Sequence, residues 1–217
     1  MSYTGEVTVG GPVDVRETPG LTITKVATPP FENNCYLLRC TATGDTLLVD
    51  AAGDAPQLLA LAGERLVGVV ETHDHWDHVQ ALEEVTAASG APVLAHEADA
   101  DDLPVPTDRR LRDGDTVTVG EAVLSVIHLE GHTPGSLALL YEGDPERPHL
   151  WSGDSLFPGG AGNTEKDADR FTSLMDDLER KVFGPLPDET WVYPGHGRDT
   201  TLGAERPNLA DWRERGW

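Results

Sequence analysis

Residues 66–78 read LVGVVETHDHWDH, an apolar run followed at once by a segment dense in histidine and aspartate. The run Leu66–Glu71 predicts a strand that is buried on both faces. In an extended chain, side chains two residues apart point to the same side, so the imidazoles of His73 and His75 would lie together. Helical zinc sites instead place two histidines one helical turn apart. We therefore predict a metal site in the loop that follows this strand.

Three more candidate ligands each follow a predicted strand and lie in a glycine-rich turn. These turns are Gly131-His132-Thr133-Pro134-Gly135, Ser152-Gly153-Asp154 and Pro194-Gly195-His196-Gly197. Glycine lets the backbone come close to a bound group. Together with the first segment, they give seven candidate metal ligands: His73, His75, Asp77, His78, His132, Asp154 and His196. One zinc ion takes three or four protein ligands, so this set predicts two metal ions that share a bridging carboxylate.

Hydrophobic periodicity predicts strands followed by helices, and then the same order again. The strands are expected at 21–28, 36–39, 46–50, 66–71, 92–95, 116–119, 122–129, 136–141, 149–151 and 190–193. The helices are expected at 54–63, 79–89, 168–183 and 207–213, with helix and loop over 97–113. This order predicts a layered α/β fold with two sheets. We expect an irregular lead-in over 1–20 and a single domain over 21–217.

The four ligand segments, with Asp154 extended to Ser152-Gly153-Asp154-Ser155-Leu156-Phe157, resemble the metallo-β-lactamase superfamily in identity and order. Within it, the pattern is most similar to the glyoxalase II-like, or hydroxyacylglutathione hydrolase-like, branch. The resemblance implies a four-layer αββα sandwich in which helices flank two mixed β-sheets. It also implies that His73, His75 and His132 hold one metal, that Asp77, His78 and His196 hold the other, and that Asp154 bridges them.

For function, the resemblance implies a dinuclear metal-dependent hydrolase that cleaves a small thioester or ester, such as a thioester of a low-molecular-weight thiol, with a metal-bound hydroxide. Two divalent metal ions are expected, with zinc as the first choice and iron or manganese as compatible alternatives. Asp77 is the expected catalytic residue, because it could orient the water or accept its proton. Four residues are expected to border the substrate pocket by their position: Phe157, Asn163, Lys166 and Arg170.

Two alternatives stay open at this point. One is a persulfide dioxygenase-like enzyme with a single iron held by His73, His132 and Asp154. The other is a metal-binding domain without catalytic activity. Within the hydrolase interpretation, the chain reads Gly162-Asn163-Thr164-Glu165 where glutathione-using relatives often carry an arginine. The sequence therefore does not predict recognition of glutathione.

Composition excludes several classes of partner. The chain of 217 residues carries 16 lysines and arginines against 38 aspartates and glutamates, a formal net charge of −22. A field of this sign repels phosphate backbones, so no nucleic-acid partner is expected. No apolar run approaches the roughly 20 residues of a membrane span, and no export signal is recognised at the N-terminus. Cys35 and Cys40 do not form a disulfide framework. We expect a cytoplasmic protein whose partner is a small-molecule substrate.

Two other polar features are expected to be structural. His128 lies inside a predicted strand, where packing is its expected role. The run 97–102, EADADD, lacks the spaced oxygen ligands and the glycine of a calcium loop, so it is expected to be a solvated helix face.

Overall fold

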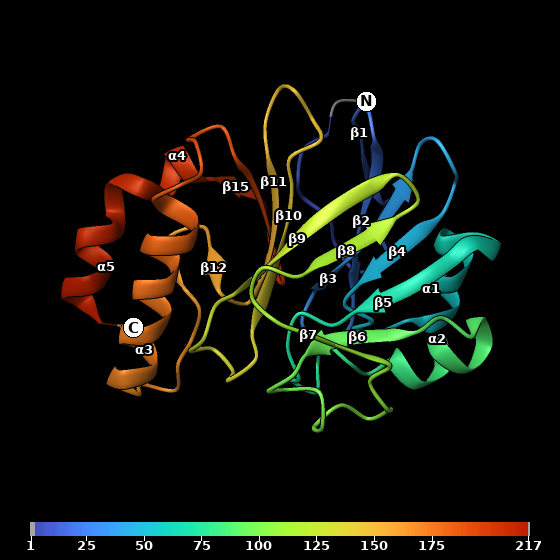
Figure 1. Ribbon diagram of the computed structural model, residues 1–217, viewed down its shortest axis with the longest axis horizontal. Coiled ribbons are helices and arrows are strands. Elements are labelled where there is room, and N and C mark those ends of the chain that lie inside the picture. The colour runs from blue at the N-terminus through green and yellow to red at the C-terminus, as the bar shows by residue number, and fades with distance from the viewer. Residues whose placement is uncertain (1–2, 217) are drawn as a thin grey trace.

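The structure is a computed structural model that describes residues 3–216. The first two residues of the expected lead-in and the last residue of the expected domain lie outside the described part. Two β-sheets face each other, and helices cover the outer side of each (Figure 1). The seven-stranded sheet has the order β1 (Asp14–Glu17), β2 (Leu21–Thr28), β3 (Asn33–Cys40), β4 (Thr46–Val49), β5 (Leu66–Val70), β6 (Val93–His96) and β7 (Arg109–Leu111).

The second sheet has six strands. Their order is β15 (Thr200–Thr201), β14 (Trp191–Pro194), β11 (His149–Gly153), β10 (Leu137–Tyr141), β9 (Ala122–His128) and β8 (Thr116–Val119). A separate small hairpin pairs β12 (Leu156–Phe157) with β13 (Gly160–Ala161). Both large sheets are mixed: β4 to β7 run parallel in the first, and β11 runs parallel to β14 in the second. The remaining strand pairs of these sheets are antiparallel within the described residues.

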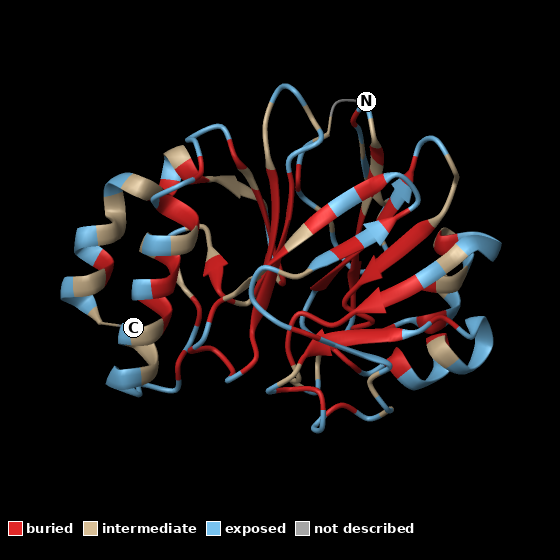
Figure 2. Cartoon of the chain, in the orientation of Figure 1, coloured by how far each residue is buried: buried red, intermediate tan, exposed pale blue. Residues whose placement is uncertain are grey.

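Three apolar clusters define the layers. The central cluster lies between the sheets and includes Leu38, Val70 and Trp151. On the outer face of the first sheet, helices α1 (Ala55–Ala62) and α2 (Leu82–Ser89) form the second cluster. On the outer face of the second sheet, the third cluster involves α3 (Ala168–Asp177), which continues as a π-helix over Leu178–Phe183, and α5 (Leu209–Arg215). Figure 2 shows buried strands between helices whose outer faces are exposed. The expected αββα sandwich is therefore confirmed.

Most expected elements are present, with small shifts at their ends. Strand β2 has the expected bounds, and α1 lies within the expected range 54–63, because the Asp54 side chain accepts from the Gln57 amide and Gly63 ends the helix. The predicted helix start at residue 79 is wrong: α2 begins at Leu82, because residues 73–81 form the ligand loop and its turns. Strand β3 begins earlier than expected, at Asn33.

The prediction of a helix within 97–113 is also wrong, and the run 97–102 is solvated only in part, since Asp101 and Asp102 are exposed whereas Asp99 is buried. This segment forms turns and ends in the short strand β7, and Pro104 and Pro106 interrupt it. Asp99 is buried because its carboxylate accepts from the Thr133 hydroxyl at 2.6 Å. The expectation of an irregular lead-in is wrong for Asp14–Glu17, which form β1 at the sheet edge with half-buried and exposed residues in alternation. The short elements α4 (Leu202–Glu205), Gly63–Arg65 and Arg206–Asn208 complete the chain.

The direction of the strands brings the ligand loops together. Strands β9, β11 and β14 all run the same way, because β9 and β11 are each antiparallel to β10 and β11 is parallel to β14. Their carboxyl ends therefore lie at one edge of the second sheet. The loop after β5 meets this edge from the first sheet, where the Leu137 amide donates to the Thr72 carbonyl at 2.9 Å. Within residues 3–216, none of the helices combines the length and the apolar character that crossing a membrane requires.

Candidate metal centre

The structure brings all seven predicted ligands to this edge. They form three overlapping groups in which the candidate ligand atoms lie within 4.8 Å of one another. The groups are His73, His75 and His132; His73, His78 and Asp154; and Asp77, His78 and His196. We call the first group cluster one and the third group cluster two. Each cluster combines residues from loops of both sheets.

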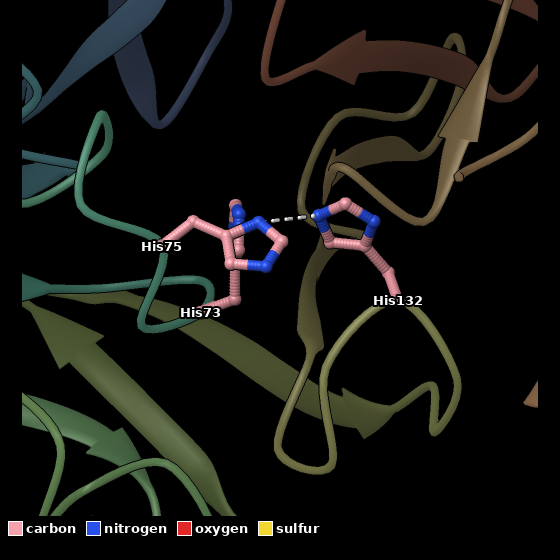
Figure 3. Close-up of side chains that lie close together, drawn as sticks. All are labelled: His73, His75 and His132. Carbon is pink, nitrogen blue, oxygen red and sulfur yellow. Dashed lines mark hydrogen bonds between the residues drawn. The ribbon is translucent and has the colours of Figure 1, made fainter. Parts of the chain in front are cut away.

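Cluster one consists of three imidazoles that face one point (Figure 3). His132 Nε2 lies 2.9 Å from His75 Nδ1. The ring of His73 lies edge-on to both other rings, with a centroid separation of 4.8 Å in each case. His73 and His132 are buried, whereas His75 is half-buried. This cluster offers three imidazole nitrogens, a donor set that suits zinc or iron.

Cluster two adds a carboxylate to two imidazoles. His78 Nε2 lies 3.1 Å from His196 Nε2. Asp77 Oδ2 lies 3.9 Å from His78 Nε2 and 3.5 Å from His196 Nε2. His78 is fully buried, whereas Asp77 and His196 are partly exposed. The cluster thus has an open side toward solvent.

Asp154 lies between the clusters. Its Oδ2 is 3.6 Å from His132 Nε2 in cluster one and 3.5 Å from His196 Nε2 in cluster two. Two buried atoms here, Asp154 Oδ1 and His73 Nε2, have no hydrogen-bond partner among residues 3–216. A buried polar atom without a partner destabilises the fold by roughly 1–3 kcal/mol. Metal coordination would satisfy both atoms, so the side chains here fit metal ions.

Each buried ligand ring is oriented by a hydrogen bond at its other nitrogen. His73 Nδ1 lies 3.0 Å from Thr72 Oγ1, and His132 Nδ1 lies 2.7 Å from the carbonyl oxygen of Asn163. His78 Nδ1 lies 2.9 Å from Asp50 Oδ2. In His73 and His132, Nδ1 donates its proton to these acceptors and Nε2 keeps its lone pair for a metal, whereas in His78 a metal would replace a second proton on Nε2. Such outer partners fix the tautomer and the direction of ligand histidines.

The pKa values of the buried histidines are shifted in opposite directions in the two clusters. Burial lowers the pKa of His132 to about 4 and that of His73 well below its usual range, so both rings are neutral at pH 7 and able to bind metal. Burial also disfavours a charge on His78, yet Asp154 and Asp50 raise its pKa well above the usual range. Burial opposes ionisation of Asp154, but His78 and His196 hold its pKa well below the usual range. Carboxylates that stabilise a proton on His78 would equally stabilise a cation.

Comparison with known families agrees with this geometry. Residues 28–196 match the family described as the metallo-beta-lactamase superfamily, and this range covers most of the chain and all seven candidate ligands. The chain belongs to the metallo-beta-lactamase superfamily. The predicted resemblance is thereby confirmed.

Three relatives within or close to this superfamily illustrate the similarity. A hydroxyacylglutathione hydrolase from Fuscovulum blasticum is 40% identical over 169 residues, which are 76% of this chain and 62% of that protein. The chain thus spans less than two thirds of the length of that relative. The solved structure of TTHA1623 in a di-iron-bound form is 31% identical, with a TM-score of 0.69 over 84% of this chain and 96% of that one. The B3 metallo-beta-lactamase BLEG-1 is 29% identical, with a TM-score of 0.76 over 85% and 96% of the two chains.

Two polar residues of this superfamily member that contact the ligands were not singled out from the sequence. Asp50 is buried at the end of β4, and its carboxylate accepts from the Thr72 amide at 2.7 Å and from the Thr72 hydroxyl at 2.9 Å, besides facing His78. Asn33 Nδ2 donates to Asp77 Oδ2 at 2.9 Å. The signal for Asp50 is present in the sequence, because it too is a polar residue directly after a buried strand.

Gly195 and Gly162 allow the chain to pack against Asp154. A Cβ atom at Gly195 would lie 2.1 Å from Asp154 Oδ1, and one at Gly162 would lie 1.8 Å from the Asp154 carbonyl oxygen. Real atoms do not approach so closely, so any side chain at either position would displace Asp154. This close approach is the role expected of glycine in the ligand turns.

A cavity of about 520 Å³ opens beside His75 and His132. Its other lining residues are Asp74, Glu130, Gly131, Thr133, Pro134, Asp169, Arg170 and Ser173. Three of these are acidic, and Arg170 is the one cation among them. Arg170 Nε donates to the Gly131 carbonyl at 2.8 Å, and its other nitrogens bond the carbonyl of His132 and the carboxylate of Glu165. The guanidinium therefore secures the ligand loop as well as bordering the cavity.

The other expected pocket residues differ in how they contact the candidate metal centre and the cavity. Phe157 is half-buried, with its ring centroid 6.4 Å from that of His196. Asn163 contributes through its backbone carbonyl, whereas its side chain accepts from the Glu165 amide. Lys166 is exposed and does not belong to the lining of the cavity beside His75. His128 stacks on His96 at 3.9 Å, away from the three ligand groups, in keeping with a packing role.

Proposed function

We propose that this chain is a hydrolase that uses two metal ions and cleaves small thioesters. The observation that carries the proposal is the position of Asp154, whose Oδ2 lies 3.6 Å from a nitrogen of cluster one and 3.5 Å from a nitrogen of cluster two. A carboxylate within reach of both clusters suits a pair of ions that share a bridge. The hydroxyacylglutathione hydrolase relative and the di-iron form of TTHA1623 support the same interpretation.

The residues of the site have distinct roles in this proposal. When bound, two divalent cations here would lower the pKa of a water molecule toward 7 and stabilise negative charge on a carbonyl oxygen. Asp77 orients that water and accepts its proton, and the Asn33 amide holds the Asp77 carboxylate in place. His75 and His132 line the cavity, so the substrate carbonyl approaches from that side. The proposal needs no serine or cysteine nucleophile.

The cavity also supports a substrate class. Asp74, Glu130 and Asp169 give it an acidic lining, and each guanidinium nitrogen of Arg170 already donates one hydrogen bond to a protein oxygen. A carboxylate-rich thiol carrier such as glutathione would meet repulsion there, and the net charge of −22 adds to it at long range. We therefore propose thioesters whose thiol carrier is neutral, rich in hydroxyl groups or cationic.

Metal analysis combined with a substrate panel tests the proposal. We expect about two metal equivalents per chain after reconstitution with zinc, iron or manganese, and hydrolysis of neutral thioesters. Asp154→Ala should lose at least one equivalent and most of the activity. Asp144→Ala is the matched control, because Asp144 also pairs with a buried imidazole, His149, at 3.0 Å. The control should keep both metals.

Two results would contradict the proposal. If Asp154→Ala retained both metals and a normal rate, Asp154 would not be part of the centre. If the native protein held a single iron and consumed oxygen with a persulfide substrate, the dioxygenase alternative would replace the hydrolase.

A further inference from the structure

A lysine lies fully buried within the sandwich, close to cluster two. Lys25, on β2, is 0% exposed. Its Nζ donates to the carbonyl oxygen of Gly5 at 2.7 Å, to that of Gly197 at 2.7 Å and to Asp199 Oδ1 at 2.6 Å. These three bonds use all the donors of an ammonium group.

Core packing alone does not explain a lysine at this position. Leu21 and Ile23 precede it at alternate positions of β2, and both belong to the apolar cluster between the sheets. The alternation calls for another apolar side chain at residue 25. Replacement of a buried ion pair by apolar side chains of similar volume is often neutral or stabilising. The contacts of Lys25 therefore point to a different role.

The Gly197 carbonyl belongs to the residue directly after the cluster-two ligand His196. It accepts a second bond from Asn34 Nδ2 at 2.9 Å. In the same turn, the Pro194 carbonyl accepts from Asn34 Nδ2 at 2.9 Å and from the Tyr36 hydroxyl at 2.7 Å. The backbone of β3 completes this arrangement, because its Asn34 amide donates to the Gly195 carbonyl at 2.7 Å. Lys25 is the charged member of the set that fixes this turn.

Asp199 connects the turn that carries His196 to other segments of the chain. Besides Lys25, its carboxylate accepts from the Tyr3 hydroxyl at 2.7 Å and from Trp191 Nε1 at 2.8 Å. Tyr3 lies in the lead-in and Trp191 opens β14, so the pair joins three segments that are distant in sequence. Hydrogen bonds therefore hold the chain on both sides of His196, at Trp191 before it and at Asp199 after it.

The turn that carries His132 in cluster one is held by different groups. Arg170 bonds the carbonyls of Gly131 and His132, and the Thr133 hydroxyl donates to Asp99. Lys25 makes none of these contacts. Each of the two histidine turns thus has its own cation, Arg170 for the one and Lys25 for the other.

We infer that Lys25 is a positioning residue for His196, which it orients through the Gly197 carbonyl, and that it thereby tunes metal binding at cluster two rather than at cluster one. The inference rests on the proposed metal centre. Loss of an outer partner of a metal ligand typically weakens metal affinity by about 10–100-fold. We expect a change of that size at cluster two when the ammonium is removed.

The test substitutes Lys25→Met, which keeps the length of the side chain and removes its charge. Zinc is titrated into metal-free protein while the Nε2 resonances of His196 and His132 are followed by ¹⁵N-resolved NMR. We expect the His196 response to move to about 10–100-fold higher zinc concentration, whereas the His132 response stays unchanged. Lys181→Met is the matched control, because Lys181 Nζ likewise bonds a carbonyl, that of His128, and a carboxylate, that of Asp177.

A second measurement keeps the inference independent of the metal. Amide hydrogen exchange on metal-free protein should be faster over residues 195–199 in Lys25→Met than in the native chain, and unchanged over residues 131–133. Asp199→Asn, which keeps the size of the side chain, serves if Lys25→Met fails to fold, and should shift both readouts in the same direction.

The outcomes separate the two proposals. If Lys25→Met only lowered the melting temperature and left the His196 response and local exchange as in the native chain, Lys25 would be structural and the inference would be overturned. Equal weakening at His132 and His196 would overturn it as well. If the native protein bound no second metal but the exchange difference were present, the proposed function would fail and the positioning of the turn by Lys25 would stand.

Discussion

Replacement of Asp50 by asparagine tests how the fold orients the candidate metal ligand His78. Asp50 Oδ1 accepts from the Thr72 amide, and Oδ2 accepts from the Thr72 hydroxyl and faces His78 Nδ1. Asparagine has the same shape, but one of its two terminal atoms is an NH₂ donor. If that group faces the Thr72 amide, two donors oppose each other. If it faces His78, the imidazole proton must move to Nε2, the atom that cluster two requires for metal.

The magnitude follows from this conflict. One buried donor without an acceptor destabilises the fold by roughly 1–3 kcal/mol, and each kcal/mol lowers the melting temperature by about 2–4 °C in a chain of this size. If the tautomer changes instead, the affinity of cluster two for metal should fall about 10–100-fold, the usual effect of losing a partner of a ligand histidine. The orientation of the amide therefore decides which quantity changes, the melting temperature or the affinity of cluster two for metal.

The assay pairs zinc competition against a chromophoric chelator with thermal unfolding of the metal-free protein. Asp101→Asn is the control, because Asp101 makes only an exposed ion pair with Arg110, which contributes little to stability. Native zinc affinity together with a native melting temperature in Asp50→Asn would refute the reasoning, since one of the two must change. A ¹⁵N spectrum of His78 would show directly which nitrogen carries the proton.

Three further predictions address substrate, pH and metal. Glu130 and Asp169 line the cavity, so replacing both by lysine should raise kcat/KM for a glutathione thioester and lower it for a cationic thioester, most strongly at low salt. Glu121→Lys, at the other end of β9, is the control and should change neither value. Burial and the stacked His128 lower the pKa of His96 to about 4. The folded protein therefore binds a proton at His96 less readily than the unfolded chain does, and the free energy of unfolding should fall as the pH drops from about 6.5 toward 4. In His96→Phe, the melting temperature should depend less on pH over that range, and an unchanged slope would disprove this assignment. Removal of metal by a chelator should lower the melting temperature without unfolding the chain at 25 °C, as measured by circular dichroism.

The parts of the fold that could be predicted from sequence are those whose signal is local. The strand at 21–28 and the helix at 54–63 depend on neighbouring residues, and both predictions are confirmed. The first ligand segment is recognisable because three histidines and two aspartates follow one apolar run within six residues, 73–78. The structure brings the ligand turns together, although their roles as metal ligands stay predictions until metal is measured.

The parts that could not be predicted depend on contacts between distant segments. Lys25 looks like a surface residue in a strand, since its acceptor Gly197 lies 172 residues further along the chain. Asp99 looks like part of a solvated acidic run, since Thr133, which buries it, follows 34 residues later. In both cases the polar residue is stabilised by a partner that only the tertiary structure brings near. Propensity cannot report such partners.

The same long-range contacts orient the side chains of the candidate metal centre. Ligands of each cluster come from loops of both sheets, yet each buried ring is already oriented by a protein acceptor, such as Asp50 for His78 or the Asn163 carbonyl for His132. The apolar layers fix the two sheets independently of these polar groups. The unpartnered Nε2 of His73 and Oδ1 of Asp154 are therefore held in place by the stability of the rest of the fold. We expect a centre whose ligands are oriented in this way to lose little conformational entropy when it takes up an ion.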